Sequence, residues 1–296
     1  MRKRNWYLVP LLAFLLAGCS GGAGEQAAEP AVQPDSVTAA PEASASGSAD
    51  VDLTPESSLK PAETAAAIEA VPDVAPEPSA EPVKAMYSMN KVFRFVPIEE
   101  DAPERAVLLT FDDGPKDETV LTSMLDTLDK HGAKAIFFVN GYRVKQNPDL
   151  LKLIHERGQT IGNHSYDHIN LKNEDADNVE SQLGKVQEDV EALIGERPKF
   201  FRPPFGAGSD IVRDTAKNHG MLYMTWSNGS LDWDKTAKGK PEVVVANVME
   251  QLHPGANILM HELEWTAEAL DELLTKIAGE SYVFIDPASI DVSLDD

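Results

Sequence analysis

The chain has 296 residues, of which 49 are acidic and 26 basic, so its formal net charge is −23. A surface this acidic repels phosphate backbones, which argues against nucleic-acid binding. The single cysteine excludes a disulfide framework and a cysteine-rich metal site, and the mean hydropathy of −0.28 excludes a polytopic membrane protein.

The composition changes along the chain, and we divide it into five segments. The first is a signal peptide, the second a disordered tether, the third a lead-in, the fourth a catalytic domain and the fifth an acidic tail. Their predicted boundaries are residues 1–18, 19–85, 86–105, 106–290 and 291–296.

The first segment is typical of a bacterial lipoprotein signal. Basic residues 2–4 precede an apolar run from Trp6 to Ala17, which is shorter than the about 20 residues that span a bilayer. The run ends in Leu16-Ala17-Gly18-Cys19, which resembles the lipobox, where the signal is cleaved before a cysteine that is then lipidated. We therefore predict lipidation of Cys19 and a protein anchored to the cell membrane, facing outside the cytoplasm. An ordinary secretory signal with an incidental cysteine is the alternative.

The second segment is rich in Ala, Pro, Glu and Ser. Between Glu25 and Lys84 it holds twelve acidic residues and two lysines. It has too few large apolar side chains to offset the entropy of folding, so we predict a disordered and extended tether.

From residue 106 onward, short apolar runs alternate with amphipathic stretches. Strands are predicted at Ala106–Phe111, Ala135–Val139, Thr160–Ile161, Phe200–Phe201, Met221–Trp226, Asn257–Met260 and Tyr282–Ile285. Helices are predicted at Glu118–Lys130, Asp149–Glu156, Glu174–Ile194, Asp210–Asn218, Glu242–Leu252 and Thr266–Ala278. This alternation indicates an α/β domain whose parallel sheet is covered by helices. The pattern alone does not decide between an open sheet and a barrel.

Polar residues cluster where the predicted strands end. In a parallel barrel the carboxyl ends of the strands share one face, and active sites lie there. We therefore expect five clusters, far apart in sequence, to converge at Asp112-Asp113, His164, Arg202, Asp232 and His261.

Two of these clusters suggest a metal site. Neighbours in a regular strand point to opposite faces, so Asp112 and Asp113 can share a site only if the chain turns, and Gly114-Pro115 is expected to provide the turn. His164 and His168 are four residues apart, a spacing that on a helical turn puts both imidazoles on one side of a metal. With one carboxylate they make a His₂Asp set. Each motif alone also fits an ordinary solvated turn or an incidental histidine pair.

The remaining clusters suggest acid–base chemistry. Arg202 begins a rigid Arg-Pro-Pro-Phe-Gly segment and can pair with a buried carboxylate in a fixed fork. Free amides at and beyond Phe205 could point at an oxyanion. His261 is a candidate general acid, because a carboxylate bonded to an imidazole raises its pKa and fixes its tautomer. A plain barrel loop and a buried histidine are the alternatives.

Together the motifs resemble those of the NodB-homology polysaccharide deacetylases, carbohydrate esterase family 4. They follow the family's order over residues 106–285: Thr110-Phe-Asp-Asp-Gly114, His164-Ser-x-x-His168, Arg202-x-Pro-Phe-Gly206, Asp232-Trp233 and Leu259-x-His261. The resemblance implies an α/β fold, a distorted (β/α)7 barrel with parallel strands.

The resemblance also implies metal-assisted amide hydrolysis with release of acetate, and Zn²⁺ as the divalent metal. The implied metal ligands are Asp113, His164 and His168. The implied catalytic groups are the general base Asp112, its positioning partner Arg202, the general acid His261 and the supporting Asp232. The implied oxyanion and acetyl-pocket residues are Phe205, Trp233 and Leu259.

The sequence departs from the family pattern at two positions. Gly229 stands where the fourth motif often has a second acid. Glu262 stands where the family usually has aspartate, and we interpret this replacement as functionally neutral. The expected function is N-deacetylation of N-acetylglucosamine in a cell-surface polysaccharide, namely peptidoglycan, by a monomer. Two alternatives stay open: O-deacetylation of acetylated xylan or muramic acid, and non-catalytic glycan binding by a lipoprotein.

Overall fold

The computed structural model describes residues 83–293. The predicted signal peptide, Cys19 and almost all of the predicted tether therefore lie outside the described residues. Among residues 83–293, no helix is both long enough and apolar enough to cross a bilayer.

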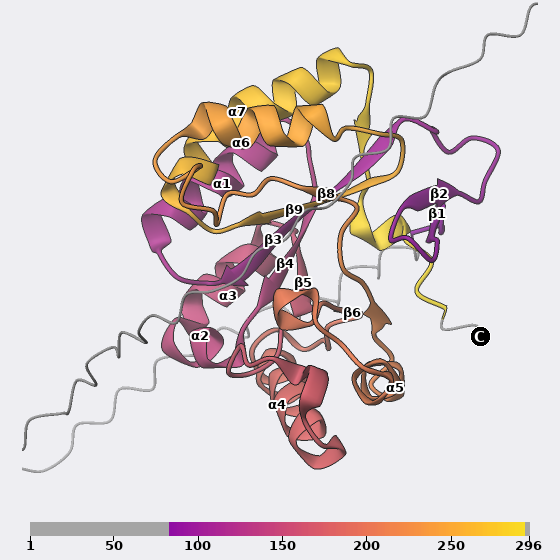
Figure 1. Cartoon of the computed structure of the whole chain (residues 1–296), viewed down its shortest axis with the longest axis vertical. Coiled ribbons are helices and arrows are strands. Elements are labelled where there is room, and N and C mark those ends of the chain that lie inside the picture. Colours follow the sequence, from indigo (N-terminus) through magenta and orange to yellow (C-terminus); the bar gives the residue numbers. More distant parts are fainter. Residues whose placement is uncertain (1–82, 294–296) are drawn as a thin grey trace, which may run out of the picture. The chain divides into compact units, whose positions relative to one another are not determined.

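A parallel sheet of eight strands forms the centre of the domain (Figure 1). Its strands follow the order β7-β6-β5-β4-β3-β9-β8, and β10 pairs with the beginning of β3. The bounds are β3 (Ala106–Gly114), β4 (Ala135–Val139), β5 (Thr160–Asn163), β6 (Phe200–Phe201), β7 (Leu222–Tyr223), β8 (Asn228–Gly229), β9 (Ala256–His261) and β10 (Val283–Phe284). The sheet curls into a partial barrel, which confirms the predicted distorted (β/α)7 fold with parallel strands.

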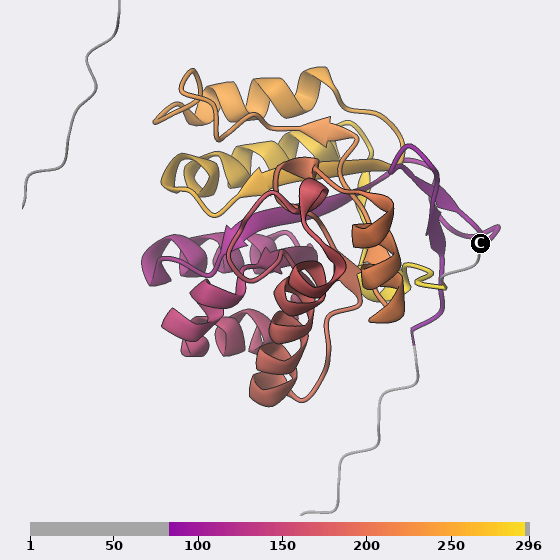
Figure 2. The ribbon, with the colours of Figure 1, turned by 60° about the horizontal axis from the view of Figure 1, so that its bottom comes forward.

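Seven helices in the described chain cover the outside of this sheet (Figures 1 and 2). Helices α6 and α7 pack side by side next to β8 and β9. The bounds are α1 (Glu118–Lys130), α2 (Gly141–Gln146), α3 (Pro148–Glu156), α4 (Ala176–Ile194), α5 (Asp210–Asn218), α6 (Pro241–Glu250) and α7 (Glu264–Gly279).

Helix α1 illustrates how the local sequence sets an element's limits. The Asp117 side chain accepts a hydrogen bond from the Val120 amide and so caps the helix at its beginning. The buried residues Leu121, Met124, Leu125 and Leu128 recur at helical spacing and face the sheet. Gly132 follows with φ +58°, a conformation that ends the helix at low steric cost.

The central strand β3 separates two apolar clusters. Leu109 and Phe111 belong to the larger cluster, which includes the buried faces of the helices. Leu108 points to the other face and packs with Phe138 and Met224 inside the barrel. Since side chains alternate along a strand, Thr110 and Asp112 share the interior face with Leu108. The strand therefore delivers the Asp112 carboxylate to the interior at its carboxyl end.

Several short elements differ from the sequence expectation, among them β7 and the lead-in. The expected strand Met221–Trp226 is reduced to β7, because its neighbour β6 stops before the Pro203-Pro204 pair, which has no amide hydrogens for a ladder. The lead-in forms an antiparallel hairpin of β1 (Tyr87–Met89) and β2 (Phe95–Pro97), which the sequence analysis did not predict.

Candidate active site

The two adjacent aspartates reach one site through a bulge in β3. Asp112 pairs with Phe138 and Gly114 with Val139, so Asp113 is the extra residue between them. Asp113 adopts φ +69°, in the left-handed region. The sequence predicted a turn at Gly114-Pro115; the structure puts the irregularity at Asp113 itself, and Gly114 still belongs to the strand.

Asp113, His164 and His168 bring three candidate ligand atoms within 4.8 Å of one another. Asp113 Oδ1 lies 3.1 Å from His168 Nε2 and 3.5 Å from His164 Nε2. This oxygen is buried and has no hydrogen-bond partner among the described residues. His164 Nδ1 donates to the Arg202 carbonyl at 2.7 Å, which leaves the lone pair of Nε2 directed at the carboxylate. The donor set fits a divalent cation.

Charge favours the ionised form of Asp113. Burial raises the pKa of this carboxyl, but the adjacent imidazoles of His164 and His168 outweigh burial and hold the pKa well below its usual range. The group is therefore an anion, as a metal ligand must be.

Arg202 is fully buried and fixes Asp112. One guanidinium nitrogen donates to Asp112 Oδ1 at 2.7 Å and to Thr110 at 2.8 Å. The other donates to the Thr225 carbonyl and to Asn257 Oδ1. Arg202 thus contacts the carboxylate through one nitrogen instead of the expected two-nitrogen fork. The second oxygen of Asp112 stays on the pocket side, 3.6 Å from His164 Nε2.

His261 and the fully buried Asp232 form a second pair. His261 Nδ1 donates to Asp232 Oδ1 at 2.7 Å, which turns Nε2 away from Asp232. Asp232 Oδ2 accepts from the His261 amide and from the Thr266 hydroxyl, both at 2.7 Å. Burial lowers the pKa of His261, but the bonded and fully buried Asp232 more than compensates, so the pKa lies above its ordinary value.

Backbone strain is concentrated around these groups. Seven described residues other than glycine have positive φ angles, and five of them belong to the segments that carry the predicted site: Asp113, Ser165, His168, Phe205 and Leu231. Such conformations cost about 1–3 kcal/mol each and persist where the surrounding structure enforces them.

A pocket of about 380 Å³ contains the predicted residues. It is lined by Asp112, Asp113, His164, His168, Phe205, Gly206, Trp226, Trp233, Leu259 and His261. Arg202 and Asp232 lie behind this lining and act on its residues, as described above. Trp226, which the sequence analysis did not single out, packs edge-on against Trp233. Its position at the end of a predicted strand was the one available signal.

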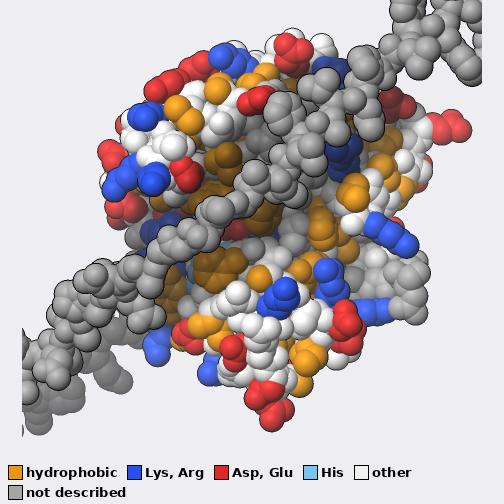
Figure 3. Space-filling model, in the orientation of Figure 1, with side chains coloured by type: hydrophobic (Ala, Val, Ile, Leu, Met, Phe, Trp, Pro, Cys, Tyr) orange, Lys and Arg blue, Asp and Glu red, His pale blue; other side chains and the backbone are white. Residues whose placement is uncertain are grey.

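Aromatic side chains form the rim of the pocket. Phe205 is 65% exposed and packs edge-on against His168, while Trp233 is 46% exposed and packs edge-on against His261. In the space-filling view, charged side chains of both signs surround the visible face, and apolar side chains gather nearer its middle (Figure 3).

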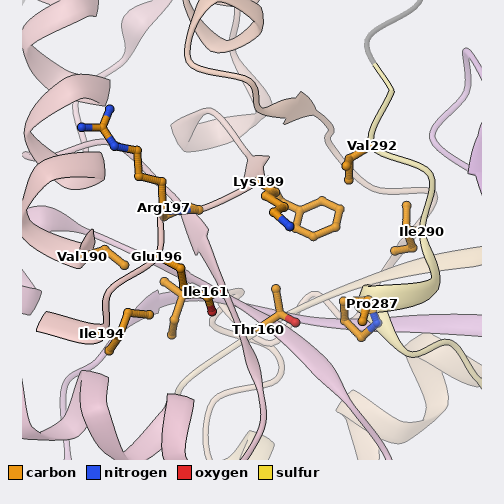
Figure 4. A pocket seen from close by; sticks show the side chains of 13 residues that line it. Thr160, Ile161, Val190, Ile194, Glu196, Arg197, Lys199, Pro287, Ile290 and Val292 are labelled. Carbon is orange, nitrogen blue, oxygen red and sulfur yellow. The ribbon is translucent and has the colours of Figure 1, made fainter. Parts of the chain in front are cut away.

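A second hollow of about 210 Å³ lies at the opposite end of the sheet, where β5 and β6 begin (Figure 4). Thr160, Lys199 and Ile290 are among its lining residues. Arg197, another lining residue, is already paired with Glu191 at 2.8 Å. The lining holds no imidazole and a single carboxylate, Glu196, so this hollow has neither the His₂Asp group nor the Asp–His pair of the first pocket.

The sequence matches a family model described as "Polysaccharide deacetylase" over residues 99–224. It is 36% identical over 206 residues to the peptidoglycan-N-acetylglucosamine deacetylase PgdA of Listeria monocytogenes, covering 67% of this chain and 42% of that protein. It is also 35% identical to the peptidoglycan-N-acetylmuramic acid deacetylase PdaA of Bacillus subtilis, covering 61% of this chain and 69% of that protein. The chain thus spans less than half of the Listeria relative.

A solved structure also indicates this family. The family 4 carbohydrate esterase pseudoenzyme of Bacillus anthracis superposes with a TM-score of 0.60 at 33% identity, over 63% of this chain and 66% of that one. Sequence, fold and pocket agree: the chain belongs to the polysaccharide deacetylase family, carbohydrate esterase family 4.

Proposed function

We propose that the chain is a metal-dependent deacetylase that removes the N-acetyl group of N-acetylglucosamine in peptidoglycan and releases acetate. The observation that carries the proposal is the convergence in one pocket of a His₂Asp group, a carboxylate held by Arg202, and a histidine held by Asp232. The names of the two deacetylase relatives support peptidoglycan as the substrate class.

Asp113, His164 and His168 hold the cation in this proposal, and Zn²⁺ suits the donor set best. When bound, the cation supplies a Lewis acid that polarises the acetyl carbonyl and makes water more acidic.

Asp112 is the general base. It accepts a proton from the water that attacks the acetyl carbon. Arg202 holds this carboxylate in place, since its guanidinium donates to Oδ1 and leaves the other oxygen on the pocket side. Because Arg202 binds Asp112 and not Asp113, the two neighbouring aspartates have different roles: Asp112 is the base and Asp113 a metal ligand.

His261 is the general acid. Its Nε2 gives a proton to the departing sugar amine, and Asp232 stabilises the imidazolium from the Nδ1 side. The Phe205 amide is the proposed donor to the oxyanion. The amides of Gly206 and Ala207 bond back to Pro203 and Pro204, which fixes the turn that presents it. Trp233 and Leu259 line the space for the acetyl methyl group.

One further candidate follows from the Bacillus anthracis neighbour, which is a pseudoenzyme: the chain could bind glycan without turning it over. The intact acid, base and ligand groups favour catalysis, because a purely binding pocket has no need of an imidazole held by the buried Asp232. Hydrolysis of O-acetyl esters uses the same groups but depends less on His261, since an alkoxide leaves more easily than an amide nitrogen.

The deciding experiment is acetate release by Zn²⁺-loaded protein from peptidoglycan, chitin oligomers and poly-N-acetylglucosamine, with Asp112→Asn as the control. We expect release from peptidoglycan and loss of release in the variant. Absence of acetate from all three substrates would overturn the proposal. Glycan binding that survives Asp112→Asn, without turnover by the parent protein, would support the non-catalytic reading.

We also propose that the protein acts as a monomer on the outer side of the cell membrane, anchored by a lipid on Cys19. The lipobox-like sequence supports the anchor, and the long acidic stretch that follows supports a tether between the membrane and the domain.

A further inference from the structure

Glu262 is a buried acid that the proposed mechanism does not use. It follows His261 at the end of β9 and is 4% exposed. Since side chains alternate along a strand, His261 points into the pocket and Glu262 points to the opposite face. It is not among the residues that line the pocket. A buried carboxyl needs partners, and those of Glu262 belong to the segment that follows Asp113.

Glu262 binds the chain between β3 and α1. Its Oε1 accepts hydrogen bonds from the backbone amides of Lys116 and Asp117, both at 2.8 Å. Its Oε2 points at Gly114, where an added Cβ would lie only 2.5 Å away. Glycine at position 114 therefore makes room for this carboxyl, in addition to any role in the turn. Glu262 Oε2 has no hydrogen-bond partner among residues 83–293.

The segment that Glu262 holds begins with the strained Asp113. Two other bonds fix the same segment from the side of α2: the Asn140 amide donates to the Gly114 carbonyl at 3.1 Å, and the Asn147 side chain donates to the Pro115 carbonyl at 3.0 Å. Glu262 holds the same segment from the side of β9. A residue with φ +69° keeps that conformation only where neighbouring contacts enforce it, so loss of one set of bonds would release Asp113.

We propose that Glu262 is a positioning residue for the metal site. It holds residues 114–117 through two backbone amides, and this keeps the Asp113 carboxylate facing His164 and His168. The inference rests on the proposed function, because it takes these three residues as the metal ligands. It assigns Glu262 no contact with substrate or metal, and its effect therefore appears first in metal affinity.

The test measures Zn²⁺ affinity by competition with a chromogenic chelator. We expect Glu262→Ala to weaken binding by about 10–100-fold, the usual effect of losing a group that orients a metal ligand. Glu262→Gln keeps an oxygen acceptor on a side chain of the same length, so its affinity should stay within about threefold of the parent, a change well below that range. Activity of Glu262→Ala at saturating Zn²⁺ should recover more fully than at low Zn²⁺.

The matched control is Gln159→Ala. Gln159 is also 4% exposed, and its Oε1 accepts from the Ala135 amide at 2.8 Å at the beginning of β4, away from the pocket. We expect this variant to lower the melting temperature of the metal-free protein without changing Zn²⁺ affinity. If Glu262→Ala behaves like Gln159→Ala, losing stability but keeping affinity, the positioning role is wrong.

A second variant tests the same contact if Glu262→Ala does not fold. Gly114→Ala adds a methyl group that collides with Oε2 and should also weaken Zn²⁺ binding. The double variant Gly114→Ala/Glu262→Gln should bind Zn²⁺ at least as weakly as Gly114→Ala alone, since the glutamine side chain meets the same added methyl group. Unchanged affinity in Gly114→Ala would overturn the inference. If the parent protein binds no Zn²⁺, the proposed metal site itself is wrong. If parent and variants bind Zn²⁺ equally well, only the positioning role of Glu262 is wrong.

Discussion

Asp232 has no access to solvent, and its two oxygens accept three hydrogen bonds, two of them from His261. This environment raises the pKa of His261 despite burial. The raised pKa keeps the imidazolium, the form that donates a proton, present to higher pH. It also makes the pair stabilising below pH 6.5, the ordinary histidine pKa, and that stabilisation is lost as pH rises through the folded-state value.

Asp232→Asn should therefore move the alkaline limb of the rate–pH profile to lower pH and reduce kcat by about 10²–10⁴-fold, the range of general acid catalysis. The profile is measured by acetate release, and the His261 pKa by NMR titration. Glu264→Gln, which removes an exposed acid at the beginning of α7, serves as the control and should leave both unchanged. An alkaline limb that stays in place in Asp232→Asn would rule out this role for the pair.

Arg202 is the second residue whose burial makes a strong prediction. Removal of one partner from a buried ion pair costs about 3–5 kcal/mol, because the remaining charge has no compensation. Arg202→Lys keeps the charge but cannot reproduce four hydrogen bonds from two nitrogens. We expect a clear loss of stability in denaturant unfolding together with loss of turnover.

The control for Arg202→Lys is Arg197→Lys. Arg197 is exposed and its pair with Glu191 is solvated, so its free energy of unfolding should hardly change. Equal effects of the two substitutions would show that the Arg202 network contributes little.

At the scale of elements, sequence periodicity was most informative where packing is regular. The bounds expected for α1, β4 and α5 are those observed, because each carries an apolar pattern and a clear end. Helix α2 was missed, since it has only six residues and begins with glycine. Strand β8 was missed because Asn228-Gly229 is a turn signal when only local sequence is considered. Its place in the sheet depends on β9, which no local pattern reveals.

The predicted site residues lie together for the same reason that the fold could be predicted: each lies near the carboxyl end of a parallel strand, either within the strand or in the segment after it. What the sequence could not provide is the local geometry. The bulge at Asp113 depends on register against β4, and the single-nitrogen contact of Arg202 depends on competing acceptors such as Thr225 and Asn257. These are long-range contacts, which residue spacing along the chain does not encode.

Strand β5 offers a test of how tightly the barrel interior is packed. A Cβ added at Gly162 would lie 2.5 Å from the Phe138 ring. Overpacking of this kind usually costs about 1–3 kcal/mol, so Gly162→Ala should lower the free energy of unfolding by that amount. Gly279→Ala, at the end of α7, meets nothing within 4 Å and should be neutral or slightly stabilising. Similar behaviour of both variants in urea unfolding would contradict the packing described here.

On the scale of the whole chain, the proposed anchor at Cys19 and the deacetylase domain are separate parts of the sequence. Cys19 precedes the first described residue by more than sixty positions, and all the proposed catalytic residues lie between Asp112 and His261. A lipid on Cys19 is therefore expected to control where the enzyme works without changing the chemistry of its pocket.

Cys19→Ser tests this separation. Each buried methylene of an acyl chain contributes about 0.8 kcal/mol, so two or more chains hold a protein stably at a membrane. In a bacterial host, the parent should sediment with membranes, whereas Cys19→Ser should leave that fraction; mass spectrometry of the mature N-terminus should find lipid only on the parent. Ser20→Ala should behave like the parent. Purified Cys19→Ser should release acetate from soluble chitin oligomers at the parental rate, since these substrates do not require a membrane location. Retention of Cys19→Ser with membranes would exclude the lipid as the anchor.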